Sequence, residues 1–357
     1  MRQETAHQIL VMGSSGYVGS VLVPVLENAG YSVIEFDANW FSNQSNIGDS
    51  GCAGGFPSEV LDVRHSSAGK LLPQADCVVY LAAVSNDPMG NRFEGVTHDI
   101  NAESAVRLAK EAKQAGVRRF IFASSCSMYG EAIDTPRKET DILNPLTAYA
   151  RSKVWAEQEL KNLSDEGFQV TALRFATACG ASPKLRLDLV LNDFVASAIL
   201  YKTIEVLSDG TPWRPLIHVE DMARAICWAL GRKKGGAFAA VNVGSDEWTY
   251  QVRELAEIVG HIIPGTTLTI NTEGTSSPDK RSYKVDFSLF QQLAPDHQPV
   301  TRIGEAIKGL KAQINSLSFN DGVHFRKSTP YIRLNTLEQH IRLGLMDEQL
   351  FWKIGSE

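Results

Sequence analysis

The sequence has few of the residues that would build a disulfide scaffold or a metal site. Its five cysteines, at positions 52, 77, 126, 179 and 227, are odd in number, and no two are close enough for a CxxC motif. The eight histidines are scattered, without an HExxH or HxxxH pair. We therefore expect no disulfide framework and no bound metal. Scattered free thiols fit a reducing cytoplasm.

The chain also lacks a long apolar run and an excess of basic residues. No uninterrupted apolar stretch approaches the ~18 residues of a membrane-spanning helix. The start, MRQETAHQIL, has no basic region followed by an apolar one, so we expect no secretion signal. Lys and Arg total 35 against 41 Asp and Glu, a net charge of −6 without basic runs, which is atypical of a nucleic-acid-binding protein. These features predict a cytoplasmic protein with neither nucleic-acid nor membrane partners.

The 357 residues, 43% of them apolar, are enough for about two domains with a large core. In the first half, strand-like and helix-like segments alternate. The strand-like segments are 8–12, 32–36, 59–63, 77–83, 119–124 and 169–175, and the helix-like ones are 17–28, 98–115 and 147–160. This alternation predicts an α/β fold, a Rossmann-type doubly wound parallel sheet with helices on both faces.

After about residue 180 the pattern becomes less regular. Helical patterns cover 187–200, 221–230 and 250–259, and strand-like ones cover 203–206 and 216–219. We expect a dinucleotide-binding domain over 1–180, with returning segments from about 207–245, and a smaller α/β substrate-binding lobe over 181–317. Residues 318–357 form a C-terminal extension with an amphipathic stretch, which we expect to dock on the body or on a partner subunit.

A glycine-rich turn, GSSGYVG at 13–19, follows the first strand-like run and opens the first helix-like one. Glycines at 13, 16 and 19 would let the backbone approach a pyrophosphate, which the free N–H groups of the helix would bind. Asp37 ends the second strand-like run, where a carboxylate can accept hydrogen bonds from ribose hydroxyls and repel a 2′-phosphate. NAD is therefore favoured over NADP. Asp62 is a second candidate, for the adenine edge, although either acid could simply end a strand at the surface.

A second constellation is typical of proton-transfer chemistry. Tyr149 and Lys153 are four residues apart at the start of a helix-like segment, so they share a helix face. An ammonium near a phenol favours the phenolate, which makes the tyrosine a usable base. Ser125, just after a buried strand, could hold the substrate oxygen beside it.

Five strings occur in an order that resembles one family: GSSGYVG at 13–19, LAAVSNDP at 81–88, SSCSMYG at 124–130, YARSK at 149–153 and RPLIHVEDMA at 214–223. The chain resembles an extended short-chain dehydrogenase/reductase of the NAD-dependent nucleotide-sugar epimerase/dehydratase family. The resemblance implies a Rossmann domain, a smaller lobe for a nucleotide-diphosphate sugar and a tightly held NAD. It also implies a homodimer formed through helices near 101–115 and 147–161.

Carried over by position, the resemblance assigns roles to individual residues. The catalytic residues are Ser125, Tyr149 and Lys153. The cofactor contacts are Gly13, Ser15, Gly16, Tyr17, Val18, Gly19, Asp37, Asp62, Val63, Leu81, Ala82, Ala83, Asn101, Tyr149, Lys153 and Phe175. The substrate contacts are Ser85, Ser125, Ser127, Tyr149, Asn192, Arg214 and Arg281. The two arginines suit bidentate diphosphate binding, although each alone could equally be a surface charge.

The chain departs from the family at three positions. The 4,6-dehydratases have Asp and Glu after the catalytic Ser or Thr, and the decarboxylases usually have Glu at the second place, but this chain has Cys126 and Ser127. Neither can protonate a leaving hydroxyl as a carboxylic acid would, so both reactions are disfavoured. Tyr80 replaces a histidine that often precedes the LAA string.

These observations predict an enzyme, an NAD-dependent nucleotide-sugar epimerase that acts through a transient 4-keto sugar. The alternative is an NAD(P)-dependent 4-ketoreductase or dehydrogenase that exchanges its cofactor in each turnover. A non-catalytic NAD-binding regulator is disfavoured, because it would not need Ser125, Tyr149 and Lys153 together.

Overall fold

A six-stranded parallel sheet forms the centre of the molecule. The computed structural model describes residues 7–41, 61–271, 282–319, 324–327 and 330–353. The strand order is β10-β6-β4-β3-β1-β2, and every pairing within the sheet is parallel. The strands are β1 (Gln8–Met12), β2 (Ser32–Phe36), β3 (Cys77–Tyr80), β4 (Arg119–Ser125), β6 (Gln169–Phe175) and β10 (Phe238–Val243). The predicted fold class is confirmed.

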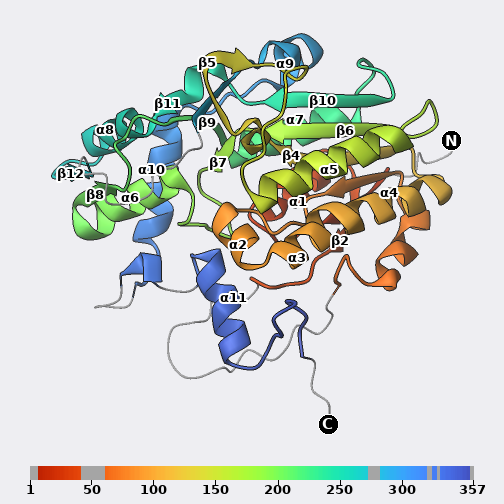
Figure 1. The fold of residues 1–357 in the computed structure, drawn as a ribbon, viewed down its shortest axis with the longest axis horizontal. Helices are drawn as coiled ribbons and strands as arrows, with labels where there is room; N and C mark the ends of the chain where they lie inside the picture. The colour runs from red at the N-terminus through yellow and green to blue at the C-terminus, as the bar shows by residue number, and fades with distance from the viewer. Residues whose placement is uncertain (1–6, 42–60, 272–281, 320–323, 328–329, 354–357) are drawn as a thin grey trace.

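Helices cover both faces of this sheet (Figure 1). Leu10 and Met12 of β1 face one apolar cluster, and Ile9 and Val11 face the other, as the period of two in a strand requires. The first cluster contains residues of α4 (Ala105–Gln114) and α5 (Ala148–Leu163), and the second contains residues of α1 (Gly19–Asn28) and α7 (Val219–Leu230). Burial on both faces explains why these strands are nearly continuous apolar runs.

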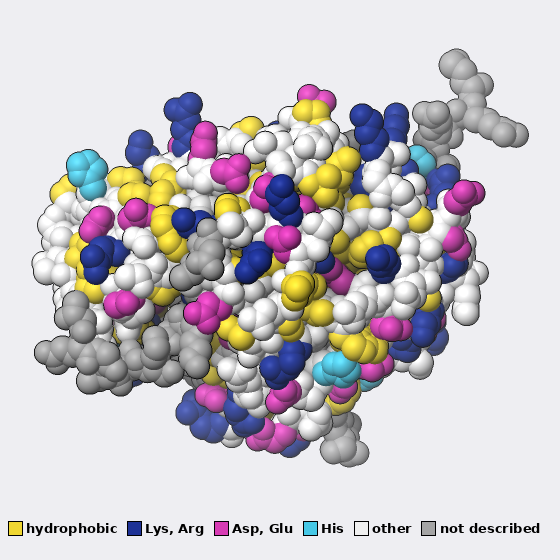
Figure 2. Space-filling model, turned by 45° about the horizontal axis from the view of Figure 1, so that its top comes forward, with side chains coloured by type: hydrophobic (Ala, Val, Ile, Leu, Met, Phe, Trp, Pro, Cys, Tyr) yellow, Lys and Arg dark blue, Asp and Glu magenta, His cyan; other side chains and the backbone are white. Residues whose placement is uncertain are grey.

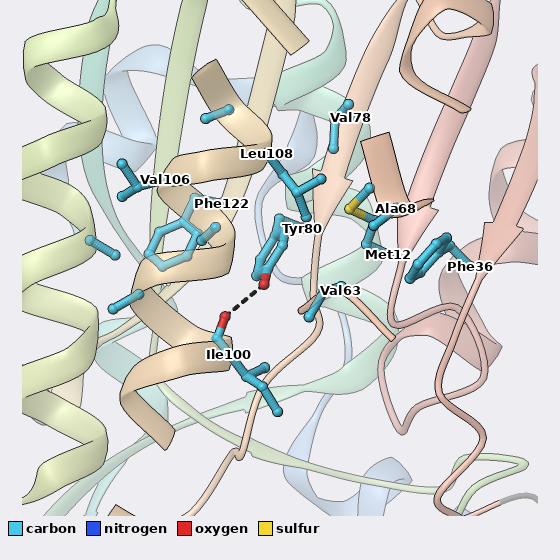
Figure 3. Packing of buried hydrophobic residues seen from close by; sticks show 14 of the residues in the cluster. Met12, Phe36, Val63, Ala68, Val78, Tyr80, Ile100, Val106, Leu108 and Phe122 are labelled. Carbon is cyan, nitrogen blue, oxygen red and sulfur yellow. Dashed lines mark hydrogen bonds between the residues drawn. The ribbon is translucent and has the colours of Figure 1, made fainter. Parts of the chain in front are cut away.

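Tyr80, where the family often has a histidine, belongs to the first cluster (Figure 3). Its side chain is fully buried, and its hydroxyl donates to the backbone oxygen of Ile100 at 2.6 Å. Ile100 lies in a π-helical turn, η3 (Asp99–Ser104), between α3 (Glu94–His98) and α4. The predicted helix over 98–115 therefore forms, but its first turn is widened. The hydroxyl of Tyr80 therefore holds one backbone oxygen of that turn.

The strand expected over 59–63 does not form in its described part. Residues 61–63 are irregular, and Leu61 donates its backbone N–H to the backbone oxygen of Asp37 at 3.2 Å. Residues 59 and 60 lie outside the described residues. A short apolar run alone cannot distinguish a strand from a segment that covers the sheet edge.

A second lobe has its own apolar cluster. It contains α6 (Val190–Tyr201), α8 (Val252–Ile262), α10 (Ile303–Asn315) and a two-stranded sheet of β8 (Thr203–Val206) and β12 (Thr267–Ile270). A three-stranded sheet consists of β7 (Thr177–Cys179), β9 (Trp213–His218) and β11 (Thr249–Gln251). A further two-stranded sheet pairs β5 (Glu131–Arg137) with β13 (Ser282–Val285). The remaining helices are α2 (Asp87–Arg92), α9 (Ser288–Leu293) and the short turns η2 (Ser66–Gln74), η4 (Cys126–Tyr129), η5 (Asp246–Trp248), η6 (Pro295–His297) and η7 (Phe325–Lys327). The domain limits given above stay a prediction.

The C-terminal extension docks on the body of the same chain. After the second lobe the chain returns as α11 (Arg333–Arg342), which lies beside α2 (Figure 1). Leu337, Met346 and Leu350 are fully buried in the first apolar cluster of the sheet. Across the described residues, no helix combines the length and apolar character needed to span a membrane.

Candidate active site

One cleft of about 1050 Å³ lies along the carboxyl ends of the parallel strands and continues between the body and the second lobe. Its walls come from the segments that follow β1, β2, β3, β4 and β6, and from α6, β9, β13 and the C-terminal extension. The chain reverses direction across the sheet between β1 and β3, because β2 lies on one side of β1 and β3 on the other. Ligands of open α/β sheets bind at such a switch point.

The glycine-rich turn forms the floor of one end of the cleft. Gly13 has a φ of +93°, and a Cβ there would lie 2.7 Å from the backbone nitrogen of Ala82. A Cβ on Gly19 would lie 2.2 Å from the backbone oxygen of Gly13. No side chain fits at either position, so the backbone itself lines the cleft at the start of α1. The first turn of α1 has no acidic residue and Val18 makes no side-chain cap, so the start of the helix is open to an anion. The N–H groups of Ser20 and Val21 already donate to the backbone oxygens of Gly16 and Val18. The residues present therefore fit the diphosphate of a dinucleotide.

Asp37, at the end of β2, lies on the wall beside this turn. Its Oδ2 accepts the backbone N–H of Ser15 at 2.9 Å and its Oδ1 that of Asn39 at 2.7 Å. Burial raises the pKa of the Asp37 carboxyl, and these two hydrogen bonds oppose the shift. Asp37 thus joins β2 to the glycine-rich turn, and its carboxylate faces the position of a ribose.

Asp62 lines the same end but is already engaged by a residue that the sequence did not single out. Arg64 donates to both carboxylate oxygens of Asp62, with the closest pair, Nη2 and Oδ2, at 2.6 Å. Both side chains are less than a tenth exposed. Asp62 therefore forms part of a fixed wall at the adenine end.

The proposed catalytic residues lie together in the middle of the cleft. Ser125 ends β4, and Tyr149 and Lys153 lie in the first turns of α5, whose start is fixed by Thr147 accepting the N–H of Ala150 at 3.1 Å. The Tyr149 side chain hydrogen-bonds Ser125. Ser125 also donates to the hydroxyl of Ser127 at 2.9 Å. The three side chains form a chain of hydroxyls that a substrate oxygen can join.

The pKa of Tyr149 is raised, although the sequence predicts that the neighbouring lysine favours the phenolate. Burial raises the pKa of Tyr149 to about 12, opposed by its hydrogen bond with Ser125 and by the charge of Arg186. Burial lowers the pKa of Lys153 to about 7, with Glu157 opposing. The Nζ of Lys153 donates to the backbone oxygen of Ala123 at 2.8 Å and lies 5.8 Å from the ring centre of Tyr149. Ser125 and Arg186 also favour the phenolate of Tyr149.

Arg186 belongs to a network beside the catalytic group that the sequence analysis missed. It forms two hydrogen bonds with Asp188, at 2.9 and 3.1 Å, and donates to the hydroxyl of Ser85 at 2.9 Å. Asn86 donates to the same carboxylate at 2.7 Å. The only sequence signal is an Arg-x-Asp spacing soon after β7. The network lines the cleft next to Tyr149 and presents polar groups to a sugar.

The far end of the cleft contains Arg214, on β9. Arg214 is 8% exposed, donates to the backbone oxygen of Trp213 at 2.9 Å and lies 5.9 Å from the ring centre of Tyr283. The other predicted diphosphate-binding residue, Arg281, lies outside the described residues.

Three predicted contacts are not brought to the cleft wall. Ser15 holds Asp37 through its backbone N–H. Asn101 is fully buried and exchanges hydrogen bonds with the backbone of Val84, and Asn192 is fully buried and donates to the backbone oxygen of Arg186 at 2.8 Å. These side chains position the wall rather than form it. The predicted residues that do line the cleft are Gly13, Gly16, Tyr17, Val18, Gly19, Asp37, Asp62, Val63, Leu81, Ala82, Ala83, Ser85, Ser125, Ser127, Tyr149, Lys153, Phe175 and Arg214.

Cys126 points away from the cleft. Its thiol is fully buried and donates to the backbone oxygen of Arg174 at 3.0 Å. Behind it, Arg174 forms a buried ion pair with Glu157 at 2.7 Å, and Ser124 donates to the same carboxylate. This network fixes the end of β4, and the position that holds an acid in the dehydratases contributes no group to the cleft.

Comparison with known proteins is consistent with this geometry. The sequence model of the NAD dependent epimerase/dehydratase family matches residues 9–244. The chain is 28% identical to a UDP-glucose 4-epimerase of Lacticaseibacillus casei over 278 residues, which is 72% of this chain and 83% of that protein. It is 27% identical to UDP-glucuronic acid decarboxylase 1 of Arabidopsis thaliana over 285 residues, 77% of this chain and 62% of that protein.

Among solved structures, MoeE5 in complex with UDP-glucuronic acid and NAD superposes with a TM-score of 0.71 at 25% identity. The match covers 87% of this chain and all of MoeE5. The predicted family, enzyme class and cofactor, NAD, are confirmed. Since the family match extends over well more than half of its length, the chain belongs to the NAD dependent epimerase/dehydratase family.

Proposed function

We propose that this enzyme is an NAD-dependent nucleotide-sugar epimerase that acts through a transient 4-keto sugar. The observation that carries the proposal is the group of Ser125, Tyr149 and Lys153 in the middle of the cleft, with no carboxylate at 126 or 127. The family includes other reactions, and similarity to an epimerase and to a decarboxylase is nearly equal. The missing carboxylates support epimerisation over dehydration or decarboxylation.

The residues have distinct tasks in this reaction. Ser125 holds the C4 hydroxyl of the sugar in line with Tyr149, and Tyr149 accepts its proton. Bound NAD supplies the hydride acceptor, and later the donor, along with a positive charge that favours the phenolate. Lys153 has three N–H donors, of which one is used on Ala123, so it can also hold the hydroxyls of a ribose. Tyr149 then returns the proton after the keto sugar has turned over.

The substrate class follows from the far end of the cleft. Arg214 lines the cleft, and we assign to it and to Arg281 the binding of the diphosphate of the sugar nucleotide. Arginine binds phosphate oxygens in a bidentate manner. The relatives named for UDP-glucose support a UDP-sugar as the first substrate to test. We further propose a homodimer in the cytoplasm, and light scattering that returns the mass of a single chain would contradict the dimer.

Product analysis by mass spectrometry tests the reaction. The purified enzyme is incubated with UDP-glucose and UDP-glucuronic acid, and products are separated before their masses are measured. An isobaric product without released NADH supports epimerisation. A change of two hydrogens would identify the 4-ketoreductase or dehydrogenase alternative instead, and loss of one water or of carbon dioxide would show that the assignment is wrong.

A further inference from the structure

The C-terminal extension is attached to the dinucleotide end of the cleft at several points. His340 bonds the backbone oxygen of Trp40 through Nε2 at 3.1 Å, and Trp352 donates from Nε1 to the backbone oxygen of Ala38 at 2.7 Å. Ala38 and Trp40 directly follow Asp37 in the chain. The extension therefore holds the segment that carries the ribose-binding acid.

The C-terminal extension also contacts the part of the cleft wall that contains Asp62. Arg64, the partner of Asp62, donates to the backbone oxygen of Leu350 at 3.1 Å and lies 3.6 Å from the ring centre of Phe351. Residues 340–352 thus contact the segment that follows Asp37 and the segment that follows Asp62. These contacts are polar or aromatic and directional, and they add to the apolar packing of α11 on the body.

Arg333, the first residue of α11, reaches into the cleft itself. It is 2% exposed, its Nη2 donates to the backbone oxygen of Lys184 at 3.1 Å, and its guanidinium lies 3.9 Å from the ring centre of Phe41. Its Nη1 is buried and has no hydrogen-bond partner among the described residues. Burial lowers the pKa of Arg333 to about 9. A buried, unsatisfied N–H of a cation is unfavourable unless an anionic ligand accepts it.

The position of Arg333 indicates which ligand this is. Asp37 and Tyr17 act on it electrostatically from the ribose end, and Arg186 and Asp188 act on it from the catalytic end. Tyr17 belongs to the glycine-rich turn before α1, and both Tyr17 and Arg333 line the cleft. Arg333 therefore lies near this turn, between the ribose end and the reaction centre. In a dinucleotide the group at that place is the diphosphate.

We propose that Arg333 donates Nη1 to the diphosphate of bound NAD, and that residues 333–352 form a strap that holds the dinucleotide in the enzyme. The inference rests on membership of an NAD-dependent family and not on the reaction proposed above. The diphosphate of the sugar nucleotide is the other possible source of this anion. The neighbours of Arg333 favour NAD, because Phe41 and Asp37 lie at the adenosine end of the cleft, whereas Arg214 and Tyr283 line the opposite end.

Release of NAD from the full-length enzyme tests the strap. The protein is loaded with labelled NAD, excess unlabelled NAD is added, and the loss of label is followed with time. Arg333→Ala and Arg333→Gln should both release NAD about ten- to a hundredfold faster than the wild type, since each removes a charge-assisted hydrogen bond. Arg342→Ala is the matched control, an exposed arginine on the same helix, and should leave release unchanged. Unchanged release in both Arg333 variants, or equal acceleration in the Arg342 control, would overturn the proposal.

Ligand fragments distinguish the two diphosphates. Calorimetric affinity for ADP should fall in Arg333→Gln while affinity for adenosine stays the same, because only ADP has the diphosphate. Affinity of the NAD-loaded protein for UDP should not change. A loss confined to UDP would assign Arg333 to the sugar nucleotide and contradict the strap. Circular dichroism of each variant shows whether it is folded, and Arg333→Lys, which keeps the charge, should restore part of the retention if Arg333→Ala does not fold.

Discussion

Burial makes Tyr149 a weaker acid in this protein than in water, although the role we propose for it as a proton acceptor requires the phenolate. Burial raises its pKa to about 12, and the group that opposes this most is the neighbouring hydroxyl of Ser125. The free enzyme thus keeps the phenol protonated at neutral pH. The phenolate has to be stabilised when substrate and cofactor fill the cleft, and exclusion of water then strengthens each nearby charge.

Replacing Tyr149 with Phe removes the proton acceptor without changing the shape of the site. We expect kcat to fall by about 10²–10⁴-fold, the typical contribution of positioned acid-base catalysis. NAD retention should stay at the wild-type level, which equilibrium binding can confirm. A variant that keeps more than a tenth of the activity would show that another group moves the proton. We expect Lys153→Ala to lower kcat further, because we assign to Lys153 both a charge beside the Tyr149 ring and a contact to the ribose of the cofactor.

We expect Asp37 to set the preference between the two nicotinamide cofactors. Its carboxylate is held by the backbone of Ser15 and Asn39, so it cannot turn away from an incoming 2′-phosphate. Asp37→Asn should lower the affinity for NAD and raise that for NADP, so that the ratio of the two approaches one. Calorimetric titration with both cofactors measures this ratio. If the unmodified enzyme binds NADP as tightly as NAD, the role assigned to Asp37 is wrong.

At the scale of single elements, α11 couples the C-terminal extension to the cofactor site, and its docking depends on a histidine. Burial lowers the pKa of His340, whose Nε2 bonds the backbone oxygen of Trp40, so the docked state favours the neutral ring. When the segment is detached, His340 regains an ordinary pKa of about 6.5. The detached state then binds protons more readily. Docking is therefore fully favoured above that pKa and weakens as the pH falls below it.

Release of NAD should accordingly become faster between about pH 7.5 and about pH 5.5, over which an ordinary histidine titrates. His340→Gln keeps an N–H donor for Trp40 but cannot titrate, so it should flatten this pH dependence. Burial also lowers the pKa of His218, at the start of α7. Its titration affects the wild type and the His340→Gln variant alike. The same acceleration in the His340→Gln variant would exclude His340 as the cause.

The elements themselves were largely predictable, because their signals are local. Strands β1, β2 and β8 form at the predicted residues. The segment 59–63 was predicted wrongly in its described part, because residues that cover a sheet edge are as apolar as a strand. The widened turn at Asp99–Ser104 gave no signal in the helical pattern, which it preserves.

The candidate site was predictable only where one segment carries it. The turn at 13–19 and the pair Tyr149 and Lys153 each lie within a single strand-helix unit. Arg186 and Arg333 reach the cleft through packing between segments far apart in the chain, and a lone arginine has no periodicity that would reveal this. The pKa of Tyr149 likewise depends on burial, which the sequence does not specify.

At the scale of the whole molecule, the cleft runs between two bodies with separate apolar clusters, and the extension contacts both. Arg326 of the extension pairs with Asp193 and Glu205 of the second lobe, at 2.7 and 3.0 Å, and α11 then packs on the first cluster. Positive and negative side chains are interspersed on the face shown in Figure 2, without a broad field of one sign. This face therefore offers no broad charged field to steer a substrate toward the cleft.

Ligands that fill the two ends of the cleft should stabilise the protein additively. A ligand that binds only the folded state stabilises it by about 2.7 kcal/mol at a hundred times its Kd. A thermal-shift screen of UDP-, dTDP-, GDP- and CDP-sugars on the NAD-loaded enzyme should show a rise in Tm for one nucleotide class above the others. Equal shifts with all four nucleotides would show that the cleft does not select the base, and no shift with any would contradict a nucleotide-sugar substrate.

The strap follows all strands of the central sheet in the chain, so it is translated after them. The central sheet is complete once Val243 of β10 has been made, but the 110 residues from Gly244 to Lys353 are still to be translated. At about 5–20 residues per second that takes roughly 5 to 20 s. During this interval a nascent chain can form the glycine-rich turn and Asp37 on a folded sheet, while the space opposite them is open to the cell. We infer that the cofactor can enter before the segment that retains it has been made.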